Sequence, residues 1–521
     1  MKEKRTGKKD RKLLWGTIII SMILSLMVFY VLYNANNKYM TREEKAIHGI
    51  LYADGSYDSL PVYYLSREWE YYPDVLLTPG DDLEKYYFRY LSIGEYGGME
   101  LDDRNGNPYG SGTYRLRIML PSEEHTYGLY LPEIFSAYNL YVDGKLIEQV
   151  GNPDPDHYEE RIQHRMFTFK GHTSVEIMIA VTDKDSASPG IQYVPAFGNP
   201  LKVNTVRGIP VFLNSSVFTL VLLVLIFSVW AFFRTRSRAN ALFAGVCVCV
   251  LGYTCYPLLH TYLALRVQPW FSLEMLFYYL TFPAMLLLEH EITGRKYKWV
   301  WWLVGFTAAA GIGATVAGIF AGGMETAALS YGVSAVTEVL KWFTAICLVV
   351  IAFFYTEGTR GLPLLAGTVL YASSLAADRI WPLYDPIIGG WFPEWGGTIL
   401  AGVFGVILWR ELTDGYRMRL IYEEQSRQME LRLMMQKEHY EKLTGALEEA
   451  SRTRHDMRQY IRTASMLLEE EHYEQLREYF HQFAKESSEK MQAPMCYCKN
   501  MSVDAILHYY AGQLEDAGVS F

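Results

Sequence analysis

The run LLWGTIIISMILSLMVFYVLY occupies residues 13–33 and contains no charged side chain. A helix needs about 20 apolar residues to cross the hydrocarbon core of a bilayer, so this run predicts a first transmembrane helix. Seven Lys and Arg residues precede it, and no small-residue cleavage site follows it. We therefore expect an uncleaved anchor, with residues 1–12 as a basic cytoplasmic tail.

Seven further apolar runs follow residue 208 and predict a seven-helix transmembrane receptor domain over residues 209–411. These runs are 210–233, 240–264, 270–290, 299–321, 331–355, 362–384 and 396–410. If the spans alternate, the loops at 234–238, 295–298 and 360 and the chain beyond 410 share one side, and they hold nearly all the basic residues between spans. The positive-inside rule makes that side the cytoplasm and puts residues 34–208 outside the cell. We expect a multi-pass protein of the cell membrane that contacts its lipids.

Residues 34–208 have the pattern of a β domain. Apolar and polar side chains alternate over 114–120 and in part over 136–142 and 174–181, and turn signals such as Asp143-Gly144 lie between such segments. Several short strands with this spacing predict a β-sandwich. The segment has no cysteine, hence no disulfide, and its 26 acidic against 16 basic side chains argue against a nucleic-acid ligand.

Few ionisable residues interrupt the apolar runs, and each is costly inside a membrane. Glu338 and Lys341 are three residues apart on one predicted helix and can pair, either to fix helix packing or to transmit a signal. Asp378 and Arg379 near the outer end of the seventh run either line a ligand pocket or reach interfacial water. No chain of carboxylates or histidines crosses the bundle, which weighs against a transporter. The Cys-Tyr-Cys at 496–498 has the wrong spacing for a metal site, and no metal is expected.

A long amphipathic helix is predicted after the last span. Eleven of fourteen positions spaced 4-3-4-3 between residues 422 and 468 are apolar, which is typical of a coiled coil, here a linker over 412–450. The helix is expected to be interrupted at Asp414-Gly415, where the glycine would act as a soft joint. A second apolar period follows an acidic corner at 469–471. It predicts a helical hairpin over 451–492 that dimerises into a four-helix bundle. The second period comprises Tyr473, Leu476, Phe480 and Phe483.

The first helix of this hairpin carries Arg454-His455-Asp456-Met457-Arg458-Gln459. In the predicted register His455 and Asp456 lie just outside the seam and face water. An exposed imidazole on a rigid helix can attack a phosphate, while a neighbouring carboxylate takes the proton of the other ring nitrogen. Arg454 and Arg458 flank the pair and could steady phosphate charge. Taken alone, such a pair is far more often a solvated helix face.

Three segments of the predicted sandwich, 69–72, 110–116 and 137–145, resemble the jelly-roll extracellular domain of bacterial seven-transmembrane receptors with diverse intracellular signalling modules. That domain is similar to galactose-binding folds. The resemblance therefore implies a carbohydrate or another small soluble ligand. Most aromatic residues of these segments, including Trp69 and Tyr114, are expected to fill the core, because alternate strand positions need apolar side chains.

Residues 454–459 resemble the H-box of histidine kinases of the quorum-sensing (GHKL) type, although Tyr460-Ile461 stands where that family has His-Leu. The resemblance implies a sensor histidine kinase of a two-component system. His455 would be the phosphorylated residue and Asp456 its general base. The protein would act as a homodimer, use ATP and Mg²⁺, and pass phosphate to a cytoplasmic response regulator.

Residues 497–500, 503–507 and 518–521 resemble the entry to the ATP-binding domain of that family, so 493–521 is predicted as its incomplete start. Residues 493–521 contain none of three motifs of that domain: the helix whose Asn coordinates magnesium, the Asp that contacts adenine, and the glycine-rich lid over ATP. We expect either a fragment of a longer kinase or a receptor lacking its own catalytic half, and no ATP turnover by these residues alone. The alternative is a non-catalytic receptor or scaffold that dimerises and regulates a partner. The sequence identifies neither ligand nor regulator.

Overall fold

The computed structural model describes residues 2–54, 56–94, 99, 109–121, 123–184, 189–294, 297–320, 327–355, 361–490 and the single residues 497, 503, 507, 511 and 514. The chain forms two compact units, Met1–Asp414 and Gly415–Phe521. An N-terminal apolar helix, an antiparallel β-sandwich and a series of long apolar helices follow one another, as predicted. The predicted start of an ATP-binding domain at 493–521 lies almost entirely outside the described residues, as do the predicted basic loop residues 295, 296 and 360.

The sandwich consists of two sheets. The larger sheet contains β1 (Ile50–Tyr52), β3 (Trp69–Pro73), β4 (Arg89–Leu91), β5 (Gly110–Met119), β7 (Ala137–Val142), β8 (Lys145–Val150) and β10 (Ser174–Asp183). Its order is β4-β3-β5-β10-β7-β8, with β1 parallel to β5. The smaller sheet, in the order β2-β11-β6-β9, contains β2 (Tyr63–Tyr64), β6 (His125–Leu131), β9 (Arg165–Gly171) and β11 (Ala196–Gly198). A short 3₁₀ helix spans Leu83–Lys85.

Alternation along the strands builds the core between the sheets. In β5, Leu116 and Ile118 are fully buried while Arg117 between them is exposed. Trp69 and Tyr114 are buried in the same core, which confirms their predicted structural role. The predicted Asp143-Gly144 turn joins β7 to β8, and both of its residues have positive φ, as a tight hairpin turn of this type requires.

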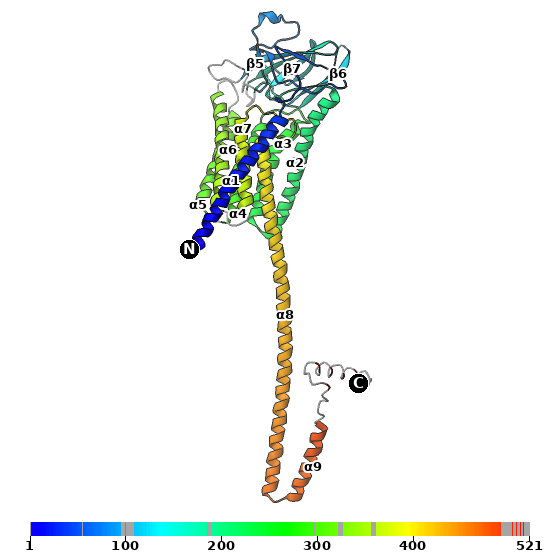
Figure 1. Ribbon diagram of the computed structural model, residues 1–521, viewed down its shortest axis with the longest axis vertical. Coiled ribbons are helices and arrows are strands. Elements are labelled where there is room, and N and C mark those ends of the chain that lie inside the picture. Colours follow the sequence, from blue (N-terminus) through cyan, green and yellow to red (C-terminus); the bar gives the residue numbers. More distant parts are fainter. Residues whose placement is uncertain are drawn as a thin grey trace. The chain divides into compact units, whose positions relative to one another are not determined.

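In the described part of the chain, eight long helices accompany the sandwich and a ninth follows them. They are α1 (Lys2–Ala35), α2 (Pro200–Thr235), α3 (Arg238–His260), α4 (Trp270–Thr293), α5 (Lys298–Phe320), α6 (Ala327–Tyr355), α7 (Gly361–Ile380), α8 (Phe392–Glu469) and α9 (Tyr473–Lys490). We call α1–α7 and the part of α8 up to Asp414 the bundle. Among the described residues, seven helices are long and apolar enough to cross a membrane: all of these except α7 and α9. The sandwich covers one end of the bundle (Figure 1).

Helix α7 lies on the predicted run 362–384, but it is less apolar than the other seven helices. It carries Thr368, Ser373 and Ser374, all buried. Helices α1 and α6 pack against it, and Gly396 at the start of α8 lies so close to Ser374 that a Cβ there would clash. Protein on several sides replaces lipid around α7, so its hydroxyls bond to backbone carbonyls within the helix instead of meeting hydrocarbon.

Helix α8 also differs from the prediction, because it runs without interruption through Asp414 and Gly415. A Cβ on Gly415 would meet no atom within 4 Å. No packing contact therefore forces a break, and a single glycine costs a helix only about 1 kcal/mol relative to alanine. The boundary between the two compact units nevertheless falls between these two residues.

Candidate functional site

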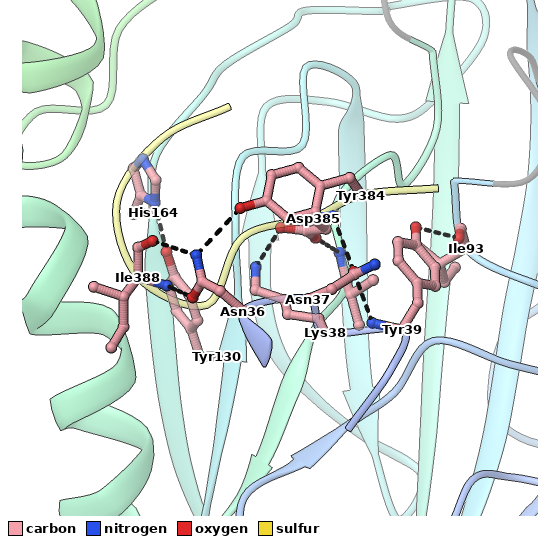
Figure 2. A network of polar contacts seen from close by, with 11 residues as sticks. Asn36, Asn37, Lys38, Tyr39, Ile93, Tyr130, His164, Tyr384, Asp385 and Ile388 are labelled. Atoms are coloured by element: carbon pink, nitrogen blue, oxygen red, sulfur yellow. Dashed lines mark hydrogen bonds and ion pairs between the residues drawn. The ribbon is translucent and has the colours of Figure 1, made fainter. Parts of the chain in front are cut away.

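A buried ion pair joins the segment after α1 to the loop between α7 and α8 (Figure 2). Lys38 Nζ lies 2.8 Å from Asp385 Oδ1, and the two side chains are 11% and 7% exposed. The other oxygen of Asp385 accepts a hydrogen bond of 2.9 Å from the backbone N–H of Val194, a core residue of the sandwich. One carboxylate therefore connects three segments. We call Asn36, Asn37, Lys38, Val194 and Asp385 the junction clasp.

The two asparagines of the junction clasp bind the backbone of the α7–α8 loop. Asn36 donates to the carbonyl of Ile388 at 2.7 Å and accepts from its N–H at 2.8 Å. Asn37 donates to the carbonyl of Leu383 at 2.9 Å and accepts from the N–H of Asp385 at 3.2 Å. Each amide thus uses its oxygen and its nitrogen, which satisfies loop groups that would otherwise lack partners.

The loop between α3 and α4 makes a second connection to the sandwich. Ile162 and Leu265 exchange backbone hydrogen bonds as an isolated bridge. The N–H of Gln268 donates to Glu160 at 3.0 Å, and Arg266 lies 3.3 Å from Glu159. With α2, which starts directly after β11 and packs against β6, the sandwich holds the bundle at three separate places.

Beside these connections, Glu133, His164 and His260 form a cluster that we call the Glu–His–His cluster. Glu133 follows β6, His164 precedes β9, and His260 ends α3. Nε2 of His164 lies 3.1 Å from Oε1 of Glu133, and Nε2 of His260 lies 3.7 Å from the same oxygen. The two imidazoles stack with their centroids 5.2 Å apart, and Tyr130 Oη lies 2.8 Å from Nδ1 of His164. One ligand atom from each residue lies within 4.8 Å of the others, which is compact enough for a metal ion.

Charge within the cluster favours the carboxylate form of Glu133. Burial raises the pKa of Glu133. The hydrogen bond and charge of His164, with the charges of His260 and Lys38, lower it by more than burial raises it, so the pKa lies below its usual value. Burial raises the pKa of Tyr130, and nearby Glu133 adds to this, so its hydroxyl stays neutral. The arrangement is an anionic oxygen between two imidazole nitrogens.

The residues predicted to carry phosphate chemistry lie on α8 in the second unit. Nδ1 of His455 is 3.6 Å from Oδ1 of Asp456, and these side chains are 77% and 58% exposed. Arg454 and Arg458 are exposed as well. The structure thus has all four predicted side chains in solvent on one helix, with His455 beside its neighbouring carboxylate.

An apolar groove lies between α8 and α9. Tyr460 packs against α9 with its ring 4.7 Å from Phe483. His455 precedes the groove residue Met457 by two positions, which is roughly 200° around an α-helix, so the imidazole faces away from the groove. The groove is lined by Met457, Tyr460, Ile461, Ala464, Ser465, Leu468, Leu476, Tyr479, Phe480 and Phe483.

No family model matches this sequence. No curated protein matches it either. Solved structures with similar parts include a GH2 β-galacturonidase from Eisenbergiella tayi (14% identity, TM-score 0.20, 27% of this chain and 24% of that one). Others are a β-glucuronidase from Faecalibacterium prausnitzii (12%, 0.18, 25% and 22%) and a putative β-galactosidase from Bacteroides fragilis (16%, 0.19, 26% and 23%). The chain spans about a quarter of the length of these proteins, and at such identities the likeness concerns fold alone.

The ionisable pairs predicted within spans differ in their surroundings. Lys341 Nζ lies 2.6 Å from Glu338 Oε1, so this pair forms as expected. Asp378 is partly buried at the end of α7, and Arg379 next to it is exposed. Glu338 and Lys341 therefore form an ion pair, whereas Asp378 and Arg379 lie side by side in sequence at a helix end. Neither pair belongs to the junction clasp.

Sequence reasoning missed other polar residues of the bundle. Glu274 and Glu289 are 8% and 0% exposed on α4, and neither oxygen of Glu289 has a hydrogen-bond partner among the described residues. His260 is 1% exposed at the end of α3. The sequence did contain a signal for these residues: each is an acidic or imidazole side chain inside or at the edge of an apolar run. Such a residue is costly in a membrane and usually functional.

Lys45, near the junction clasp, has an unusual ammonium group. Its Nζ donates to Thr41 Oγ1 at 2.6 Å and to the carbonyl of Lys38 at 3.2 Å. Burial lowers the pKa of Lys45 to about 8, with Glu43 raising it and Arg67 lowering it by smaller amounts. The folded protein therefore holds this proton less tightly than the unfolded chain does.

We expect Lys45→Met to remove a pH-dependent part of the stability. Between pH 8 and the ordinary lysine value of 10.5, the unfolded chain binds a proton that the folded chain lacks, so the free energy of unfolding of the wild type should rise with pH in this window. The variant should lose that rise and gain about 1 kcal/mol at pH 7, where the half-solvated ammonium is charged. Thermal unfolding across pH 7–10.5 measures both. Lys170→Met, at an exposed site, should keep the rise.

Proposed function

We propose that this protein is a membrane sensor of a two-component system. In this proposal the β-sandwich binds a carbohydrate or another small soluble ligand outside the cell. The bundle transmits binding to the cytoplasmic hairpin, where His455 is phosphorylated and passes phosphate to a response regulator. The observation that carries the proposal is the exposed His455–Asp456 pair on α8, the helix that also forms part of the bundle.

Phosphoryl transfer to histidine requires chiefly that these side chains be correctly positioned. A nitrogen of His455 attacks the γ-phosphorus of ATP, an N–P bond forms, the bond to the β–γ bridging oxygen breaks, and ADP leaves. Asp456, 3.6 Å from Nδ1, takes the proton from that nitrogen as the ring acquires phosphate on Nε2. Arg458, one near-turn further along the helix, can bind the phosphoryl oxygens. ATP and Mg²⁺ would be bound by an ATP-binding domain of the quorum-sensing kinase type and presented to His455.

The apolar groove of the hairpin supports a homodimer. Ile461, Leu468 and Phe480 are 65%, 56% and 54% exposed in the single chain, which is unfavourable for side chains of this size. Pairing two hairpins would bury them in a four-helix bundle. His455 would remain on the outside of that bundle, because it lies on the side of α8 away from the groove.

Transmission is supported by the three connections between sandwich and bundle. A ligand that changes the sandwich would act on the α7–α8 loop through Asp385 and on the α3–α4 loop through Glu160. Helix α8 starts directly after the first of these loops. A displacement of that loop therefore reaches the helix that carries His455 without an intervening relay domain. The orientation rests on Arg234, Arg236 and Arg238 at the turn between α2 and α3, which the positive-inside rule assigns to the cytoplasm.

The proposal is tested by phosphorylation of the full chain in lipid nanodiscs, supplied with an ATP-binding domain of the quorum-sensing kinase type and labelled ATP. We expect acid-labile, alkali-stable label on the wild type and its loss in His455→Ala. His439→Ala is the matched control, because His439 is also exposed on α8 and should keep the label. Label that persists in His455→Ala would contradict the assignment. Dimers without any label would favour a receptor that regulates its partner without phosphorylation.

Replacing Gly415 with alanine should stiffen α8 at the boundary between the two units. The new methyl group meets nothing within 4 Å, so we expect a gain of about 1 kcal/mol in local helix stability. Slower hydrogen exchange of the flanking amides measures that gain. Gly445→Ala is the matched control, because its methyl group is equally unobstructed on the same helix. Only the Gly415 change should alter His455 labelling; equal labelling in both variants would remove Gly415 as a joint.

A further inference from the structure

We propose that Glu133, His164 and His260 bind one divalent transition-metal ion, with Zn²⁺ as the representative, between the β-sandwich and the bundle. The inference concerns a part of the molecule that the proposed phosphotransfer does not use, so either can fail alone. The three residues come from three segments that are far apart in sequence: the loop after β6, the residue before β9, and the end of α3. Two imidazoles and one carboxylate form a donor set that zinc accepts in proteins.

The distances suit a metal centred between the three side chains. Zinc bonds of about 2.0 Å in tetrahedral geometry bring two ligand atoms to about 3.3 Å from each other. The two measured separations from Glu133 Oε1, 3.1 Å to His164 and 3.7 Å to His260, lie on either side of this value. The remaining ligand pair is within 4.8 Å, so a small rotation of the rings closes the triangle. Three protein ligands leave a fourth position for water or another donor.

The surroundings of the two histidines favour a metal over a simple hydrogen-bond network. Tyr130 Oη lies 2.8 Å from Nδ1 of His164, so it would accept from Nδ1–H once Nε2 binds a metal, as outer partners of metal-bound histidines commonly do. His260 is 1% exposed, so its imidazole is removed from water. Its Nε2 lies 3.7 Å from Glu133, which is longer than a hydrogen bond. A metal ion between Nε2 and Glu133 would bind this nitrogen of the buried imidazole, which has no hydrogen bond to the carboxylate.

The ion has a route into the cluster and a structural consequence. The side chains of Glu133 and His164 are 22% and 13% exposed, so a hydrated ion can reach them before it engages His260. Because His260 belongs to α3 and the other two ligands belong to the sandwich, binding would fasten α3 to the sandwich. Removal of the ion should then loosen this contact, without touching the junction clasp at Asp385.

The experiment uses the full chain, purified without a histidine tag, stripped with chelator and returned to lipid nanodiscs. Zn²⁺ binding is measured by metal content and by the shift in Tm, and Co²⁺ is added as a spectroscopic probe. We expect one metal per wild-type chain, a Tm raised by Zn²⁺ and lowered again by chelator, and Co²⁺ absorption bands typical of nitrogen and oxygen ligands. Glu133→Gln and His164→Ala should each weaken binding at least 100-fold.

His157→Ala provides the matched control, because His157 also lies beside a carboxylate of the sandwich, 3.0 Å from Asp154, but on its exposed surface. It should bind the metal as the wild type does. Zinc that binds equally well to Glu133→Gln and His164→Ala would overturn the site. If those variants fail to fold, the wild type decides alone: absence of Co²⁺ bands and of a Zn²⁺-dependent Tm shift would equally overturn it.

Discussion

Replacing Asp385 with alanine should lower the free energy of unfolding of the first unit by about 3–5 kcal/mol. The change leaves the Lys38 ammonium, whose side chain is 11% exposed, without its carboxylate. It also removes the acceptor for the N–H of Val194 in the sandwich core. An unpaired buried charge costs far more than the loss of an exposed one, because it keeps its desolvation penalty without the compensating attraction. Thermal unfolding of the full chain in nanodiscs measures the loss.

Two further variants separate this effect from a general loss of charge. Glu438→Ala breaks an ion pair of similar length with Lys442, but both partners are exposed, so almost no stability should be lost. Lys38→Met combined with Asp385→Leu replaces both buried charges with apolar groups and should recover most of the stability. A double variant as unstable as Asp385→Ala would show that the hydrogen bond to Val194, and not the ion pair, dominates.

Trp69→Ala should destabilise the sandwich by about 3–5 kcal/mol, the range expected when a large aromatic residue leaves a cavity in a packed core. Trp69 is completely buried between the sheets, and its Nε1 donates to the carbonyl of Leu65 at 2.8 Å. Trp69→Phe keeps most of the packing but leaves that carbonyl without its donor, and should cost about 1–2 kcal/mol. Unfolding of the full chain monitored by near-ultraviolet circular dichroism follows both.

Tyr87→Ala is the control for Trp69, because Tyr87 is an aromatic residue of the same domain that is 69% exposed. Its loss should change stability by less than 0.5 kcal/mol. Trp69→Ala that unfolds like the wild type would contradict the packing argument. It would also reopen the possibility that this tryptophan serves a ligand instead of the core.

The parts of the fold that were predictable are those with a local signal. Alternation identified β5, β7 and β10, and Asp143-Gly144 identified the hairpin turn, because strand periodicity and turn chemistry are properties of adjacent residues. Hydropathy located the apolar runs but not the ends of the helices that contain them. Helix α2 begins ten residues before the predicted run, where Asn199 caps the first turn by accepting from the N–H of Leu201 and proline occupies N1. The cap was present in the sequence, outside the apolar window.

The junction clasp and the Glu–His–His cluster could not be predicted in this way. Asn36 and Ile388 are 352 residues apart, and no periodicity links a polar loop after one helix to a loop before another. Glu133, His164 and His260 lie in three different segments with no ligand spacing between them. In contrast, the exposure of His455 was predictable from its position just outside the apolar seam, and it is 77% exposed in the chain. Phosphorylation of His455 stays a prediction.

The enclosure of α7 has a consequence for biogenesis. A segment this rich in hydroxyl groups gains little by entering lipid alone, so it should wait beside the insertion machinery for neighbouring helices. One neighbour, α1, is synthesised more than 300 residues earlier, and another, α8, is synthesised directly after α7. The ribosome therefore delivers one of these neighbours long before α7 and the other only after it. A nascent chain stopped before α8 should leave α7 accessible to chemical labelling, whereas the finished chain should protect it.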